Sequence, residues 1–470
     1  MSNSSSTIFT SLILFAASTA VPAMIQRNKN NNNNINKTFH VEEGIQDEHD
    51  NQLSLLSKST DRPKCIYLDY NGTTPVYPQV LRAMMPYLTH EFGNPSSSHA
   101  YGHGPRRAVI EARRKIARYI LELDDCSDEN VRESIVFVGC GSEADNLAIH
   151  LALRSNAAGN KRHIVTTNVE HPAVMECLKY LEQDGSDVSV TYVGVNQEGL
   201  VSAAEVIAAI QADTCLVTVM LANNETGALM PVKEIAQECR QRGVLFHTDA
   251  AQAVGKVNLA VQSSLGGSDM VTIVGHKFGA PKGIAALYIR PGCLEEHGRQ
   301  LPTLFGQSGA LILGGGQEKG RRAGTENVPY IVGIGEAASM ISKNDQERMR
   351  ILRDNILSKI ISYGNLKSNQ FRINGPKDKN KILPNTLSIS FQGISASLLL
   401  DSIQQRVAIS AGSACHAGEK DKISSILVSM SVPQEFSKGT LRISVGPRTD
   451  ESEIEKAAEL ISKEVKRLQN

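Results

Sequence analysis

From about residue 66 onward, short apolar runs rich in Val, Ile and Leu alternate with longer stretches in which apolar residues recur every three or four positions. The apolar runs predict buried strands, and the longer spacing predicts amphipathic helices. The predicted strands are Ile135–Val138, His163–Thr167, Val188–Val193, Leu216–Leu221, Val244–Thr248, Met270–Val274 and Ile284–Ile289. The predicted helices are Arg106–Ile120, Glu143–Leu153, Ala173–Gln183, Ser202–Gln211 and Val232–Arg242. This alternation favours an α/β fold with a mostly parallel seven-stranded sheet covered on both faces.

Two features refine this picture. The connection between Met270–Val274 and Ile284–Ile289 is too short for a helical crossover, which predicts an antiparallel pair. After about residue 335 the pattern changes to a long helix near 347–362, a strand near Thr386–Phe391 and then helices to the C-terminus. We therefore expect a large domain at 61–335, with an N-terminal arm at 61–80, and a smaller α+β domain at 336–470.

The first sixty residues follow neither pattern. Phe9–Ile25 is largely apolar, but no Lys or Arg precedes it, and the run Asn30–Asn34 follows. A secretory signal normally carries a basic segment before its apolar stretch, and a mitochondrial presequence is normally rich in Arg. We expect residues 1–60 to be a disordered or targeting extension outside the fold. The expected location is cytoplasmic, with a mitochondrial or membrane-tethered protein as the alternative.

Composition excludes several classes of protein. The 49 Lys and Arg residues balance the 49 Asp and Glu residues, so the basic excess typical of a nucleic-acid-binding protein is absent. The eight cysteines form no CxxC pair, which argues against a zinc ribbon and against a disulfide scaffold. We accordingly expect no metal site and no nucleic-acid partner.

Polar motifs stand where predicted strands end, which is where ligands bind in open α/β sheets. They are Gly139-Cys-Gly-Ser-Glu143, Glu170-His-Pro172, His247-Thr-Asp-Ala-Ala-Gln252 and Gly275-His-Lys277. Singly, each has an ordinary explanation: Asp249 could cap a helix, and Lys277 could be a surface charge. Together they supply a lysine for an imine, a carboxylate for a pyridine nitrogen, a phosphate-binding turn and a ring for stacking. That set is the chemistry required by pyridoxal 5'-phosphate.

Longer motifs occur along the chain: Leu68-Asp-Tyr-Asn-Gly-Thr-Thr-Pro75, Phe92-Gly-Asn-Pro-Ser-Ser97, Ala222-Asn-Asn-Glu-Thr-Gly227, Arg322-Ala-Gly-Thr-Glu-Asn327, Ala411-Gly-Ser-Ala-Cys-His416 and Leu441-Arg-Ile-Ser-Val-Gly446. With them, the chain from about Cys65 to the C-terminus resembles the cysteine desulfurase/selenocysteine lyase family of class V aminotransferase-like enzymes. The resemblance implies a fold-type I pyridoxal-phosphate enzyme. Thr272–Phe278, Gly314–Glu318 and the residues around Cys415 are most similar to selenocysteine lyases.

The resemblance also implies a role for individual residues. Lys277 would bind the cofactor as an imine, Asp249 would pair with the ring nitrogen, and His171 would stack on the ring. Gln252 would contact the phenolic oxygen and Asn224 would orient cofactor or substrate. The remaining implied contacts are Gly141, Ser142 and His276 at the phosphate, Thr325 reaching the phosphate from a second subunit, and Arg442 and Asn71 at the substrate carboxylate.

Cys415 decides the reaction that the resemblance implies. It lies among small residues in Ser410–Gly418, and a thiol nucleophile must be accessible and partly ionised. His416 is equally well explained as a local base or as a polar loop residue. The predicted function is a selenocysteine lyase that yields alanine and selenide, and the alternative is a cysteine desulfurase that forms a Cys415 persulfide. A scaffold without activity is a third hypothesis. The implied partners are a second copy of the chain and an acceptor protein for selenium or sulfur.

Overall fold

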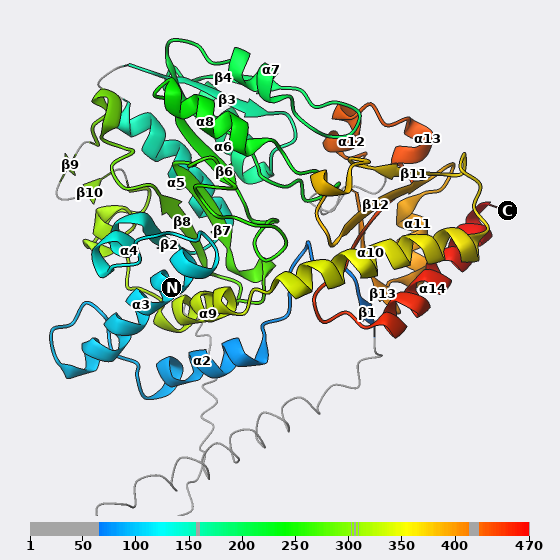
Figure 1. Ribbon diagram of the computed structural model, residues 1–470, viewed down its shortest axis with the longest axis horizontal. Coiled ribbons are helices and arrows are strands. Elements are labelled where there is room, and N and C mark those ends of the chain that lie inside the picture. Colours follow the sequence, from blue (N-terminus) through cyan, green and yellow to red (C-terminus); the bar gives the residue numbers. More distant parts are fainter. Residues whose placement is uncertain are drawn as a thin grey trace, which may run out of the picture. The chain divides into compact units, whose positions relative to one another are not determined.

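The computed structural model describes residues 65–156, 160–301, 303–304, 307–308, 310–412 and 423–469 (Figure 1). The predicted extension at 1–60 and the predicted nucleophile Cys415 lie outside these residues. Within the described ranges, none of the helices combines the length and the apolar character needed to cross a membrane.

The larger sheet has seven strands, as the alternating pattern predicts. Six strands run parallel, and β8 runs antiparallel to both of its neighbours, so the predicted antiparallel pair is confirmed. In spatial order the strands are β2 (Ile135–Val138), β8 (Ala285–Ile289), β7 (Met270–Val274), β6 (Leu245–Asp249), β5 (Thr214–Thr218), β3 (His163–Thr167) and β4 (Ser189–Val193).

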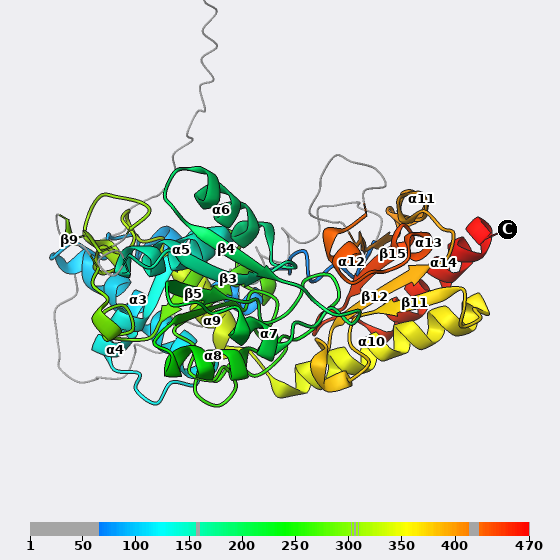
Figure 2. The same ribbon diagram turned by 90° about the horizontal axis from the view of Figure 1, so that it is seen from above.

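Helices cover both faces of this sheet (Figure 2). One face packs against α5 (Gly141–Ser155) and α6 (Pro172–Gln183). The other face packs against α2 (Pro78–Thr89), α3 (Ala100–Tyr119), α4 (Asp128–Ser134), α7 (Ala203–Ala208), α8 (Val232–Gln241) and α9 (Val328–Ser339). Alternate residues of β2 accordingly enter different cores: Phe137 joins one cluster and Val138 the other.

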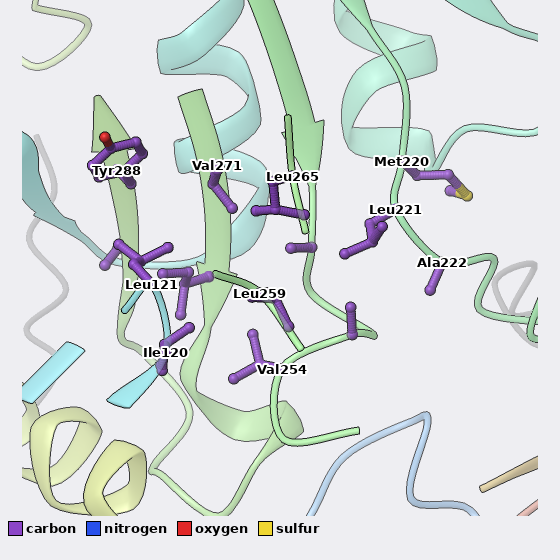
Figure 3. Packing of buried hydrophobic residues seen from close by; sticks show 14 of the residues in the cluster. Ile120, Leu121, Met220, Leu221, Ala222, Val254, Leu259, Leu265, Val271 and Tyr288 are labelled. Atoms are coloured by element: carbon purple, nitrogen blue, oxygen red, sulfur yellow. The ribbon is translucent and has the colours of Figure 1, made fainter. Parts of the chain in front are cut away.

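Figure 3 shows residues of the hydrophobic core on the face that is covered by α3, α8 and α9. There Leu121, Leu259 and Leu265 pack around Val271 of β7. All four side chains are completely buried or nearly so. Packing on both faces holds the strands rigidly, so the side chains at their carboxyl ends have fixed positions. A short hairpin of β9 (Thr303–Leu304) and β10 (Gln307–Ser308) lies outside the seven-stranded sheet.

The second sheet corrects one prediction. The chain after 391 does not consist only of helices, because β14 (Ser410–Ala411) and β15 (Thr440–Ser444) join β11 (Phe371–Asn374) and β12 (Thr386–Phe391) in the order β11-β12-β15-β14. Strand β15 alternates polar and apolar residues over only five positions, a weak signal that helical neighbours obscure. The surrounding helices are α10 (Lys343–Gly364), α11 (Ala396–Ile403), α12 (Ser425–Ser429), α13 (Gln434–Ser437) and α14 (Glu451–Gln469).

The N-terminal arm connects the two sheets. Strand β1 (Ile66–Tyr67) pairs in parallel with β13 (Val407–Ala408), and Leu68 is buried in the hydrophobic cluster of the C-terminal sheet. Farther along the arm, the backbone N–H of Thr74 donates to the carbonyl oxygen of His276 at 2.8 Å. The arm therefore packs with both predicted domains, and the division at 335 stays a prediction.

Candidate active site

A cavity of about 400 Å³ lies at the carboxyl ends of β6 and β7. Its volume is within the range typical of small-molecule sites. The helix α5, the arm, the segments that follow β3 and β5, and the strands β14 and β15 also contribute to its wall. Ten of the twelve predicted site residues line it: Asn71, Gly141, Ser142, His171, Asn224, Asp249, Gln252, His276, Lys277 and Arg442.

Lys277 is held at the cavity wall by the arm. It closes the 3₁₀ turn η2 (Gly275–Lys277) after β7, and its Nζ donates to the carbonyl oxygens of Asn71 at 2.7 Å and Gly72 at 3.0 Å. Hydrogen bonds to two backbone carbonyls orient the amine without neutralising it. The alternative of a solvated surface lysine does not fit this position.

Asp249 is the last residue of β6 and is buried. Its Oδ1 accepts the backbone N–H of Ala251 at 2.8 Å. Burial raises the pKa of this carboxyl, while His171 and Lys277 oppose the rise. An additional cation beside the carboxyl would keep it ionised, and a protonated pyridine nitrogen is such a cation.

His171 combines a structural and a cavity-facing position. It precedes α6 as the N-cap residue, and its Nδ1 accepts the N–H of Ala173 at 3.1 Å. Burial lowers the pKa of the imidazole, with Asp249 opposing and Lys277 assisting this shift. Because Nδ1 accepts a hydrogen bond, the ring is neutral with its proton on Nε2. A neutral, oriented ring at the cavity wall is suited to stacking.

The N-terminus of α5 forms one end of the cavity. Gly141 begins the helix and Ser142 follows, so unpaired backbone N–H groups and a hydroxyl face the same region. Gly141 has no room for a side chain, because a Cβ there would lie 2.7 Å from a methyl group of Val274. His276 approaches from η2, and burial lowers the pKa of its ring to about 4.

Arg442 comes from β15 and is 3% exposed. Its Nη2 donates to Asp69 Oδ1 at 2.7 Å, and its Nη1 donates to the carbonyl oxygen of Asn224 at 3.3 Å. Both contacts aim the guanidinium at the cavity. A buried guanidinium with two parallel donors matches the geometry of a carboxylate.

The side chain of Asn71 is engaged within the protein. Its Nδ2 donates to the carbonyl oxygen of Asn224 and to Thr386 Oγ1, and its Oδ1 accepts from Asn385. Its carbonyl oxygen binds Lys277. The residue therefore joins the arm to both sheets, and its predicted contact with substrate stays a prediction.

Thr325 does not line this cavity. It lies in a separate hollow with Gly139, Arg322 and Glu326, beyond the N-terminus of α5. In one chain Thr325 is thus separated from Lys277, and its predicted contribution to a second subunit's site stays a prediction. Cys415 is outside the described residues, but Ser410 of β14 lines the cavity, and five residues span at most about 18 Å.

Three buried charged residues near the cavity were given no role from the sequence, although Glu170 belongs to a strand-end motif: Asp145, Glu170 and Lys256. Asp145 lines the cavity, and its buried Oδ1 makes no hydrogen bond but lies 3.7 Å from Nε2 of the buried His247. Burial, then Asp249, raise the pKa of its carboxyl. Burial raises the pKa of Glu170 to about 8. A sequence signal existed for Asp145, because it occupies the apolar face of α5 between Ala144 and Leu147.

Pyridoxal phosphate fits this set of residues. The cavity supplies an amine at Lys277, a carboxylate at Asp249 and a helix N-terminus at Gly141–Ser142. The carboxyls of Asp145 and Asp249 are both buried at the cavity, and the raised pKa of Asp249 indicates that a cationic group fits beside them.

Comparisons with known proteins agree with this geometry. Residues 66–457 match the family described as Aminotransferase class-V. The cysteine desulfurase of Trichormus azollae is 42% identical over 412 residues, covering 86% of this chain and 93% of that protein. The cysteine desulfurase IscS of Clostridium botulinum strain Hall is 38% identical over 405 residues, covering 86% of this chain and 95% of that protein.

Solved structures are similar as well. A NifS-like protein superposes with a TM-score of 0.71 at 30% identity and covers 85% of this chain and 98% of its own. A structure described as SspA in complex with cysteine has a TM-score of 0.66 at 31% identity and covers 82% of this chain and 100% of its own. The predicted fold class is therefore confirmed.

Proposed function

This chain belongs to the aminotransferase class-V family, and on that premise we propose that it is a cysteine desulfurase that transfers sulfur from L-cysteine to Cys415 and releases L-alanine. It is a pyridoxal-phosphate-dependent enzyme, as its family is. The observation that carries the proposal is the single cavity that brings together Lys277, Asp249 and Arg442.

When bound, pyridoxal phosphate supplies an electron sink that makes the proton on the substrate's Cα labile. Lys277 would hold the cofactor, and its amine would act as the general base at the substrate's Cα. Asp249 would keep the ring nitrogen protonated, and Gly141 and Ser142 would hold the phosphate. Arg442 binds the substrate carboxylate, exchanging its contact with Asp69 for a contact with substrate.

Cys415 accepts the sulfur. Its thiolate attacks the substrate sulfur, so an S–S bond forms while the Cβ–S bond breaks, and the carbon skeleton takes up protons and leaves as alanine. The enzyme retains a persulfide, so cysteine and one thiol are converted to alanine and one persulfide without any other reagent. Release of that sulfur to an acceptor protein completes the cycle in this proposal.

Selenocysteine lyase is the second candidate. The sequences of Thr272–Phe278 and Gly314–Glu318 favour it, whereas the relatives compared above are named cysteine desulfurases. The relatives therefore favour what the sequence motifs left as the alternative. Both reactions use the same residues, so only turnover separates them.

We expect the purified protein to form alanine from L-cysteine in multiple turnovers when a thiol reductant is present, with one sulfide released per alanine. The measurement is alanine and sulfide or selenide from L-cysteine and L-selenocysteine in parallel assays. Turnover of selenocysteine with no more than stoichiometric alanine from cysteine would replace the desulfurase proposal by the lyase.

We also propose that the chain acts as a homodimer. Thr325 and Arg322 lie in a hollow that is separate from the cavity of Lys277 in the same chain. In the proposed dimer, Thr325 of one subunit contacts the phosphate of the cofactor that is bound to Lys277 of the other subunit. We expect light scattering to give twice the mass of one chain at assay concentration, and Thr325→Ala to weaken cofactor retention. A fully active monomer would contradict this prediction.

A further inference from the structure

Lys256 is a buried lysine beneath the cavity. It is 5% exposed and lies in the turns that follow β6. Burial, together with the nearby charges of Lys277 and Arg442, lowers the pKa of its ammonium to about 7. Placing a third cation beside two others is unfavourable, so this position calls for a specific interaction.

That interaction is with Gln252. Lys256 Nζ donates to Gln252 Oε1 at 3.2 Å, and Gln252 Nε2 donates to the carbonyl oxygen of Asn71 at 3.0 Å. An ammonium has no acceptor, and a carbonyl has no donor. Both contacts therefore require the same orientation of the Gln252 amide, with its oxygen toward Lys256 and its nitrogen toward the carbonyl oxygen of Asn71.

The amide nitrogen of Gln252 lies beside the amine of Lys277, because both donate to the same carbonyl oxygen of Asn71. In pyridoxal phosphate, the ring carbon that bears the aldehyde is flanked by one carbon that bears the phenolic oxygen and another that bears the phosphate arm. Gly141 and Ser142 occupy the phosphate end of the cavity. With the phosphate at that end, the phenolic oxygen would lie on the opposite side, where the amide nitrogen of Gln252 would be a donor to it.

We propose that Lys256 is a positioning residue that fixes the amide of Gln252 so that a hydrogen-bond donor faces the phenolic oxygen of the cofactor. The inference rests on the proposed function, since it needs a cofactor attached to Lys277. A donor at this oxygen stabilises the phenolate after Lys277 Nζ has lost its proton, and it thereby lowers the pH at which that proton leaves.

Other charged groups also affect the pH at which Lys277 Nζ loses its proton, and the substitutions in the test leave these groups unchanged. Besides Lys256, the charged or titratable groups near Lys277 are Asp69, Asp145, His171, Asp249, His276 and Arg442. Substituting Lys256 removes one positive charge as well as one hydrogen bond. Both changes favour the protonated form of the bond between Lys277 Nζ and the cofactor. Both therefore raise the pH at the midpoint of its deprotonation.

The test follows the absorbance of the bound cofactor as pH is varied. We expect Lys256→Met to raise the midpoint by about one pH unit or more relative to wild type. Lys233→Met is the matched control, because it removes an exposed lysine on α8, and it should leave the midpoint unchanged. Where Lys256→Met does not yield folded protein, Lys256→Gln serves, with a smaller rise expected because a polar group is retained.

A Gln252→Ala background separates the hydrogen bond from the charge. If Lys256 acts through Gln252, Lys256→Met will shift the midpoint much less in that background than in wild type. Full additivity, or an unchanged midpoint in folded Lys256→Met and Lys256→Gln with the cofactor band present, would overturn this inference alone. A wild-type protein without any lysine-bound cofactor band would overturn the proposed function along with it.

Discussion

Replacing Lys277 by Ala will abolish the visible absorbance band of the bound cofactor and reduce alanine formation from cysteine by at least about 10⁴-fold. The expected loss is large because one residue both attaches the cofactor and moves the Cα proton, and the proton transfer alone contributes about 10²–10⁴-fold. The fold should survive, since the arm still bonds to His276 through the backbone of Thr74.

Absorbance spectra and alanine assays of Lys277→Ala, with thermal unfolding as the check on folding, measure this expectation. Lys282→Ala is the matched control, because Lys282 lies five residues further on and is exposed. It should keep both the band and the activity. A folded Lys277→Ala protein that retains the band and turnover would refute the assignment of the cavity.

Replacing Cys415 by Ala should separate cofactor chemistry from sulfur transfer. Lys277, Asp249 and Arg442 remain in place, so the cofactor band and the spectral change on adding cysteine should persist. Alanine formation from cysteine should fall to background, because no thiolate remains to take the sulfur. Selenocysteine turnover should fall less, since the weaker C–Se bond and the better leaving group permit elimination without the thiol.

Cys140 provides the competing hypothesis and the control. Among the seven cysteines that the structure describes, it alone is exposed, and it lines the cavity. Burial raises the pKa of Cys177 to about 11 and that of Cys215 to about 12, which makes both poor nucleophiles. Cys140→Ala should retain desulfuration. Loss of sulfur transfer in Cys140→Ala, with wild-type rates in Cys415→Ala, would assign the nucleophile to Cys140 instead.

The sequence alone determined the layered α/β architecture and most of the large sheet. Strands buried on both faces must be apolar throughout, so His163–Thr167 and Met270–Val274 were located to the residue. Strand ends also located Asp249 and Lys277, because residues that terminate parallel strands share one edge of the sheet. The resemblance of longer motifs added Arg442, which no local pattern distinguishes.

Only the tertiary structure decided how the distant segments meet. Strand β15 was missed because its five residues form a strand by pairing with β12 and β14, and Arg442 reaches the cavity through that pairing. Asn71 contacts Asn385, which is 314 positions away along the chain, and its carbonyl oxygen orients both Lys277 and Gln252. Lys256 resembles any surface lysine in sequence. It is buried because segments distant in the sequence pack around it in the folded chain, and the residues next to it in the sequence do not reveal that packing.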